Sequence, residues 1–143
     1  MKIPAYFPDC STDPLCSNDV CNPALSPKQR AAALVTLFTS TEKVQNLLNG
    51  APGVPRIGLG AYQWWQEGLH GIASSPGVQF ASGNSSFSSA TSFPAPITIG
   101  AAFDDDMVKS IAEVISTETR AFNNDGRVGL DLWVTTPTSL GSY

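Results

Sequence analysis

Residues 97–134, ITIGAAFDDDMVKSIAEVISTETRAFNNDGRVGLDLWV, decide the fold class predicted for this chain. Apolar residues alternate with small or polar ones over 97–101, a pattern typical of a strand. Apolar residues at helical spacing follow, and residues 123–126 (NNDG) would end that helix. Residues 130–134 (LDLWV) indicate another strand. The order strand, helix, strand is that of βα units around a parallel sheet.

The helix in this stretch carries two further signals. Its apolar stripe consists of Met107, Val108, Ile111, Ile115 and Phe122. Asp104, Asp105 and Asp106 stand at its start, where acidic side chains oppose the positive end of the helix dipole. The same three acids could form a cation site, but a helix start explains them more simply, so no metal site is predicted.

Two shorter helices are predicted upstream. Ser26-Pro27 has the residue types preferred at an N-cap and at the first helical position. Thr39 and Glu42 have the spacing of a capping box, so a second helix begins there and ends at Asn49-Gly50. The residues expected to face inward are Ala31, Leu34, Val35 and Phe38 in the first helix and Val44, Leu47 and Leu48 in the second.

The remaining segments are irregular. Residues 1–25 read as a turn-rich arm, and residues 53–59 (GVPRIGL) predict a turn that leads into a short extended segment. Residues 60–96 are rich in Gly, Ser and Pro and lack helical periodicity. A structureless stretch of that length is usually functional or disordered.

Composition limits the classes of partner. Hydrophobic residues make up 42% of the 143 residues and charged residues only 14%, which indicates a globular chain and not a disordered one. The net charge is −4 and no cluster of Lys or Arg stands out, so no nucleic-acid partner is expected. No apolar run approaches the roughly 20 residues of a membrane span, so no membrane partner is expected either.

All three cysteines, Cys10, Cys16 and Cys21, lie in the arm. Their clustering in a turn-rich segment suits a disulfide in an oxidising compartment, and free thiols are the alternative. Zinc is not expected, because it takes four ligands and the only histidine, His70, is distant in sequence. No signal peptide is visible at the start, so either the chain is cytosolic or its true start lies upstream. Residues 84–86 (NSS) form a glycosylation sequon, which matters only in a secreted protein.

The segment most suited to chemistry is residues 62–71, YQWWQEGLHG. It holds two of the three tryptophans, a glutamate and the only histidine. Aromatic rings match the C–H faces of sugars, and carboxylates match their hydroxyls through charge-assisted hydrogen bonds. The alternative is that both tryptophans belong to the core and that His70 binds a carbonyl group. No nucleophile elbow, catalytic triad or dinucleotide fingerprint is recognised.

Several separate blocks resemble one family. Residues 64–71 (WWQEGLHG) resemble the Trp-Trp-x-Glu-x-Leu-His-Gly signature of the fungal and plant β-xylosidases of glycoside hydrolase family 3. Further blocks in the same order are residues 8–10 (PDC), 20–21 (VC), 53–56 (GVPR), 92–97 (SFPAPI), 115–124 (ISTETRAFNN) and 129–133 (GLDLW). The likeness covers roughly residues 5–133, and it outweighs the alternative in which the tryptophans are core residues.

The resemblance implies a secreted, retaining exo-hydrolase that removes xylose from the non-reducing end of xylo-oligosaccharides without a cofactor. It implies an α/β fold, namely the amino-terminal portion of a (β/α)8 (TIM-type) barrel whose loops hold the sugar site. The expected domains are an arm over residues 1–25, the first part of the barrel over residues 26–133 and a divergent tail over residues 134–143.

The resemblance also assigns the site residues. Glu67 takes the position of a carboxylate that binds hydroxyls of the terminal sugar, and Trp65 lines the same subsite. No catalytic residue is expected in this chain, because the family's nucleophilic Asp and acid/base Glu lie further downstream. The chain alone should therefore be inactive. Gln66 and Gly68 depart from the commoner Ser or Asn and Ala of the family.

For the arm, the resemblance implies a disulfide between Cys10 and Cys21, which leaves Cys16 free. Two other functions stay in consideration. One is a non-catalytic sugar-binding module that keeps the platform of Trp65 and Glu67. The other is an arabinofuranosidase, or a bifunctional enzyme, of the same family.

Overall fold

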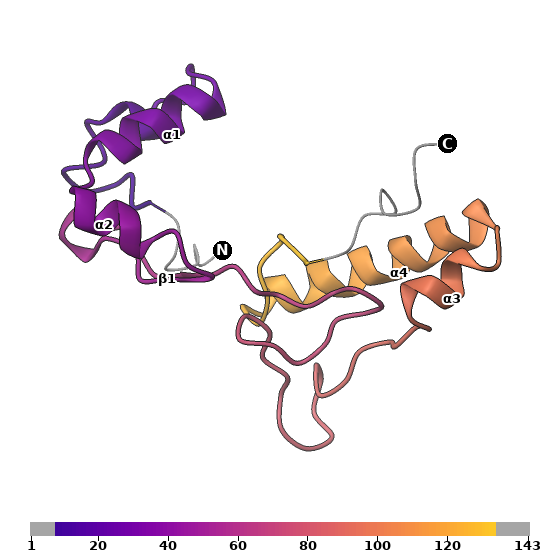
Figure 1. Ribbon diagram of the computed structural model, residues 1–143. Coiled ribbons are helices and arrows are strands. Elements are labelled where there is room, and N and C mark those ends of the chain that lie inside the picture. The colour runs from indigo at the N-terminus through magenta and orange to yellow at the C-terminus, as the bar shows by residue number, and fades with distance from the viewer. Residues whose placement is uncertain (1–7, 134–143) are drawn as a thin grey trace. The chain divides into compact units, whose positions relative to one another are not determined.

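The computed structural model describes residues 8–133, and the chain divides into two compact units, Met1–Gln63 and Trp64–Tyr143 (Figure 1). Each unit has a small hydrophobic cluster of its own. The predicted tail over residues 134–143 lies outside the described residues. The predicted limits of the arm and of the barrel portion stay predictions.

The first unit begins with three helical segments. They are η1 (Asp19–Cys21), α1 (Pro27–Thr36) and α2 (Ser40–Gln45). Ser26 and Thr39 are the N-caps of α1 and α2, and each forms a capping box with the residue three positions further on. The two helix starts predicted from the sequence are therefore confirmed.

Helix α2 ends earlier than predicted, at Gln45 and not at Asn49-Gly50. The side chain of Asn46 accepts a hydrogen bond from Gly53 N (3.0 Å) and donates to the carbonyl oxygens of Glu42 (2.8 Å) and Gly53 (3.1 Å). These bonds satisfy groups at the helix end and connect it to the following turn.

The apolar residues in and after α2 are exposed. Val44, Leu47 and Leu48 are 67%, 82% and 65% exposed, so the prediction that they face inward is wrong. Leu47 and Leu48 follow the early end of the helix. They therefore do not lie on the helical face where the sequence periodicity placed them.

The core of the first unit is a cluster of four buried apolar residues. Its members are Leu15, Val20, Val54 and Ile57. Leu34 and Phe38 pack against this cluster as predicted, whereas Ala31 and Val35 are exposed. The stripe that α1 presents to the core is therefore narrower than the sequence pattern indicates.

A disulfide joins Cys10 to Cys21, whose Cα atoms are 5.6 Å apart, and Cys16 is an exposed free thiol. This is the pairing that the family resemblance implies. Because the crosslink restricts the unfolded chain, a loop of this size stabilises the folded arm by about 3 kcal/mol on a chain-entropy argument. Arg30 Nε also donates to Val20 O (2.7 Å) and so connects α1 to η1.

The predicted turn after α2 is present. It contains η2 (Pro55–Ile57) and is closed by antiparallel pairing of Val54 with Leu59. On either side of it, β1 (Gly50–Ala51) pairs antiparallel with β2 (Tyr62–Gln63). These two strands have two residues each, so the sheet is a short two-stranded ladder that brings the two ends of the turn together.

An ion pair holds this turn to α2. Arg56 Nη2 lies 2.6 Å from Glu42 Oε2, and Arg56 Nε donates to Glu42 Oε1 at 2.7 Å. Hydrogen bonds from Arg56, and after them those from Thr39, lower the pKa of Glu42 from an ordinary 4.5 to about 2. The carboxylate therefore stays charged well below the pH at which an unpaired glutamate becomes protonated.

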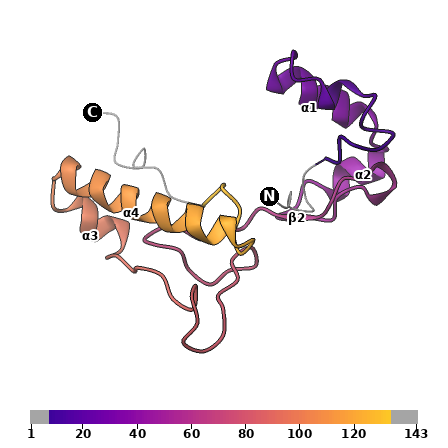
Figure 2. The same cartoon turned by 180° about the vertical axis from the view of Figure 1, so that it is seen from behind.

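In the second unit, the segment predicted as a strand at residues 97–101 is largely a helix. Helix α3 (Pro96–Gly100) begins with a proline, whose fixed φ suits the first helical position, where no N–H is needed. Ile97 is 85% exposed. The alternation of Ile97 and Ile99 with small or polar residues therefore does not bury one face of a sheet. Figures 1 and 2 show from both sides that α3 lies beside α4 (Asp105–Asn124).

Helix α4 is confirmed, with the start and the end that the sequence predicts. Asp104 is its N-cap and accepts a hydrogen bond from Met107 N (2.9 Å). Gly126, with a φ of +75°, follows the last turn. Of the predicted apolar stripe only Phe122 is fully buried, and the other members are partly exposed.

Phe122 lies in the hydrophobic cluster of the second unit, together with Ile72, Val78 and Val128. The edges of two further aromatic rings complete this packing. The ring centroids of Phe80 and Phe87 lie 5.4 and 5.0 Å from that of Phe122. Helix α4 is thus fixed to the loops by its last turn.

The second predicted strand is reduced to one bridge. Trp133 pairs in parallel with Glu67: Trp133 N donates to Gln66 O (2.7 Å), and Gly68 N donates to Trp133 O (3.2 Å). Among residues 8–133 no strand is longer than two residues. The predicted helix is therefore present and the first predicted strand is wrong, whereas the second predicted strand is represented, within the described residues, by this single parallel bridge. No helix in this described range is long and apolar enough to cross a membrane.

Candidate functional site

The candidate site lies in the long segment over residues 60–96, which is irregular but held by hydrogen bonds. Gly77 N donates to Trp65 O (2.9 Å), and Ala73 N donates to Glu67 O (3.1 Å). The segment therefore folds back on the residues that the sequence singles out. A segment of this length is expected to be functional or disordered, and these hydrogen bonds show that it is ordered.

His70 and Gly71 fix the end of the tryptophan-rich segment. Phe93 N donates to His70 O (2.8 Å), and His70 Nδ1 lies 2.9 Å from Phe93 O. The carbonyl contact that the alternative interpretation gives to His70 is therefore present. Gly71 has a φ of +121°, and a Cβ there would lie 2.2 Å from Thr91 O. Only glycine fits at this position.

Glu67 is half-buried, and its carboxylate is oriented by neighbours in the same segment. Its Oε1 accepts a hydrogen bond from Leu69 N (3.2 Å), and its Oε2 accepts a long one from Trp65 Nε1 (3.4 Å). The backbone N–H of Glu67 donates to Ser75 Oγ (3.0 Å). A carboxylate oxygen can accept about two hydrogen bonds, so both oxygens can also accept one from a ligand hydroxyl.

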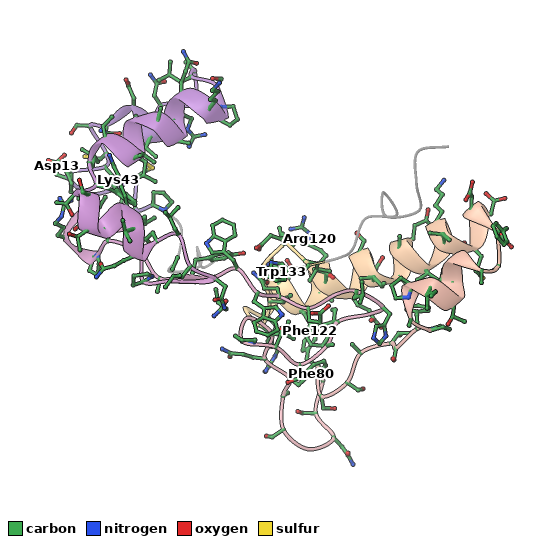
Figure 3. All side chains as sticks on the ribbon, in the orientation of Figure 1. Asp13, Lys43, Phe80, Arg120, Phe122 and Trp133 are labelled. Carbon is green, nitrogen blue, oxygen red and sulfur yellow. A yellow bond between two sulfur atoms is a disulfide. The ribbon has the colours of Figure 1, made fainter. Side chains whose placement is uncertain are left out.

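Two tryptophans form an exposed aromatic surface next to this carboxylate. The rings of Trp65 and Trp133 stack, with centroids 6.0 Å apart and planes 24° apart. The two residues are 41% and 52% exposed, so the interpretation of Trp65 as a core residue is wrong. Figure 3 shows Trp133 on the other side of Phe122 from Phe80. The aromatic surface is therefore separate from the buried cluster.

Gln66 connects the loop to the segment after α4. It is 1% exposed, accepts a hydrogen bond from Gly129 N and donates to Asp131 Oδ1 (2.8 Å). A buried N–H that lost such a partner would destabilise the fold by about 1–3 kcal/mol. A Cβ at Gly68 would lie 2.8 Å from Leu132 Cδ1, so glycine leaves room for this leucine. Both departures from the family pattern thus contact the segment after α4.

Comparisons with known proteins show what this chain is similar to. No protein-family model matches the chain. The chain is 61% identical over 128 residues to a probable exo-1,4-beta-xylosidase of Aspergillus terreus and 50% identical over 127 residues to the exo-1,4-beta-xylosidase of Emericella nidulans. A solved GH3 exo-beta-xylosidase in complex with a xylobiose aziridine activity-based probe has 47% sequence identity and a TM-score of 0.77. Over nearly its whole length the chain is similar to exo-β-xylosidases of glycoside hydrolase family 3.

The likeness involves most of this chain and a small part of each relative. It covers 89% of the chain and 16% of each of the two curated relatives, and 96% of the chain and 17% of the solved structure. The chain thus spans about one sixth of the length of the curated relatives that it matches.

Sequence reasoning named two residues that the structure brings together, Trp65 and Glu67. It did not identify Trp133 or Gln66 as parts of the same site. The aromatic residue at the end of LDLW could have indicated a further site residue. The sequence does not indicate that Trp133 pairs with Glu67, which lies 66 positions upstream. Within residues 8–133, no group of three or more His, Cys, Asp or Glu side chains could hold a metal ion.

Proposed function

We propose that this chain supplies part of the substrate-binding site of a β-xylosidase that releases terminal xylose from xylo-oligosaccharides. The observation that carries this proposal is the Glu67 carboxylate beside the stacked, exposed rings of Trp65 and Trp133. The names of the relatives support it, because they are exo-1,4-beta-xylosidases and one was solved with a xylobiose-derived probe.

Each part of the site matches one feature of a xylose ring. An indole ring accepts a C–H face of the sugar by apolar contact. The Glu67 carboxylate accepts hydrogen bonds from sugar hydroxyls, and such charge-assisted bonds are stronger than neutral ones. The N–H groups of Leu69 and Trp65 already orient this carboxylate, which reduces the ordering that binding requires.

The groups that break the glycosidic bond are proposed to come from other parts of a longer protein. Retaining hydrolysis takes two carboxyl groups about 5–5.5 Å apart, one as nucleophile and one as acid and base. The family resemblance supports a position for both of them downstream of the segment that this chain matches. Substrate binding by Glu67 and Trp65 does not replace those two steps.

We further propose that the second unit is the first part of a (β/α)8 barrel. Two features support this. The parallel pairing of Glu67 with Trp133 is of the kind found between neighbouring barrel strands, and α4 lies between the two in sequence. The overall likeness to the solved GH3 enzyme agrees with it. In such barrels the loops after the strands carry the active site.

We also propose that the longer protein is secreted. The support is the disulfide between Cys10 and Cys21, because disulfides persist in oxidising compartments and are rare in the cytosol.

A chimeric enzyme tests the proposed function. The matching segment of the Emericella nidulans relative is replaced by the corresponding 127 residues of this chain, and the release of xylose from xylobiose is measured. We expect kcat/KM within about tenfold of the parent enzyme, which corresponds to a loss of at most about 1.4 kcal/mol of transition-state stabilisation. The 143-residue chain alone should release no xylose.

Three other outcomes would contradict this assignment. A chimera with the parent's circular dichroism and Tm but without turnover would exclude the role in a β-xylosidase. Faster hydrolysis of an aryl α-arabinofuranoside than of an aryl β-xyloside would favour the arabinofuranosidase alternative. Xylobiose binding by the isolated chain, together with an inactive chimera, would favour the sugar-binding module.

A further inference from the structure

Residues 84–86 form the only Asn-X-Ser/Thr tripeptide of the sequence, and the site described above does not use it. We propose that Asn84 is an N-glycosylation site. The proposal is independent of the sugar-binding role of Glu67, and it requires that the chain enters the secretory pathway.

The base of the loop that carries Asn84 is anchored. Ala81 N donates a hydrogen bond to Phe87 O (2.9 Å), which closes the loop. The ring of Phe87 packs edge-on against Phe122, and the guanidinium carbon of Arg127 lies 5.9 Å from the Phe87 ring centroid. The loop is thus tied to the hydrophobic cluster at its base.

The tip of the same loop is exposed. Asn84, Ser85 and Ser86 are all exposed, and an added Cβ at Gly83 would meet no atom within 4 Å. Ser85 Oγ donates to Ser82 O (2.8 Å), which shapes the tip. Within the described part of the chain, neither the amide of Asn84 nor the hydroxyl of Ser86 is engaged in such a bond. The Asn84 amide, which accepts the sugar, and the Ser86 hydroxyl, which completes the sequon, are therefore accessible.

The direction of the loop leaves room for a bulky modification. Figures 1 and 2 show from both sides that the loop extends away from α4. Figure 3 shows Phe80, from which the chain enters the loop, on the opposite side of Phe122 from Trp133. An oligosaccharide on Asn84 would accordingly lie away from the aromatic surface of Trp65 and Trp133.

The modification is a complete group transfer. The donor is an oligosaccharide linked through pyrophosphate to a polyisoprenoid lipid. A bond forms between the amide nitrogen of Asn84 and the anomeric carbon of the first sugar, while the bond from that carbon to the phosphate oxygen breaks. The lipid pyrophosphate leaves, and one amide proton is lost. The result is a bulky, solubilising group on a surface loop.

Translation into microsomes tests the proposal. The full 143-residue chain, fused behind a cleavable secretory leader, is translated with microsomes, and protease protection establishes its translocation. We expect a mobility shift of one glycan that endoglycosidase removes. After enzymatic deglycosylation in ¹⁸O-labelled water, the peptide containing Asn84 should carry ¹⁸O-labelled aspartate at that position.

Three variants identify the acceptor. Asn84→Gln and Ser86→Ala should abolish the shift, because the first removes the acceptor amide and the second removes the hydroxyl of the sequon. Ser85→Ala changes the position that the sequon does not specify, so its shift should persist. A translocated chain with no shift would overturn the proposal, as would a shift that survives Asn84→Gln.

Discussion

Replacing Glu67 with glutamine in the chimeric enzyme should lower kcat/KM for xylobiose by roughly 5- to 150-fold. This fall corresponds to a loss of about 1–3 kcal/mol of transition-state stabilisation. Glutamine keeps the shape of the side chain but loses the charge that strengthens its hydrogen bonds to sugar hydroxyls. It also places an amide donor where one carboxylate oxygen now accepts from Leu69 N or Trp65 Nε1. Glu67→Ala should lower kcat/KM further, because it removes every hydrogen bond and leaves a void.

The matched control for this prediction is Glu113→Gln. Glu113 is an exposed glutamate on α4, and its backbone oxygen accepts a hydrogen bond from Thr117 Oγ1 (2.8 Å). This variant should keep the kinetics of the unmodified chimera. Unchanged kinetics for both Glu67 variants would remove Glu67 from the sugar site.

The isolated chain should not unfold in a cooperative thermal transition. Within residues 8–133, the hydrophobic cluster of each unit has four buried apolar residues, which is too few to offset the conformational entropy of the long loops. Large apolar side chains remain outside these clusters. Phe103, Ile97 and Leu47 are 96%, 85% and 82% exposed. We expect a broad transition, weak protection from hydrogen exchange and binding of a dye that reports exposed apolar surface.

Calorimetry and circular dichroism on the monomeric chain measure this directly. The disulfide-intact chain should be compared with the chimera, in which the same segment is expected to be protected. A sharp transition whose calorimetric and van't Hoff enthalpies agree would contradict the prediction. It would also favour a self-sufficient sugar-binding module over a segment of a larger barrel.

The helix starts could be predicted from the sequence because their signals are local. Ser26, Thr39 and Asp104 each cap a helix through a hydrogen bond to a backbone N–H within three residues. Helix ends were less predictable. The side chain of Asn46 bonds to Gly53, seven residues ahead, and stops α2 before the expected Asn49-Gly50.

Strands could not be predicted in the same way, because a strand exists only with a partner. The alternation around Ile97 and Ile99 looks like one face of a sheet, yet Pro96 starts a helix there and Ile97 is exposed. The apolar run that ends in Trp133 meets a single partner, Glu67. Five alternating residues are too few to separate these outcomes.

In the candidate site, too, residues with a local sequence signal could be predicted and those that depend on distant contacts could not. Trp65 and Glu67 lie two positions apart, so a local motif and its family resemblance were enough to name them. Trp133 and the bonds of Gln66 to Gly129 and Asp131 depend on contacts across more than 60 residues. The register of such contacts is a tertiary property, and composition or periodicity does not contain it.

The central claim is that Glu67 binds hydroxyls of a terminal xylose. The most direct test is a crystal structure of the chimera with D-xylose bound. The account predicts a Glu67 carboxylate oxygen within about 2.5–3.0 Å of a xylose hydroxyl oxygen, with the ring of Trp65 or Trp133 against a C–H face of the sugar. A xylose bound in the active site without contact to Glu67 or to either tryptophan would contradict the account.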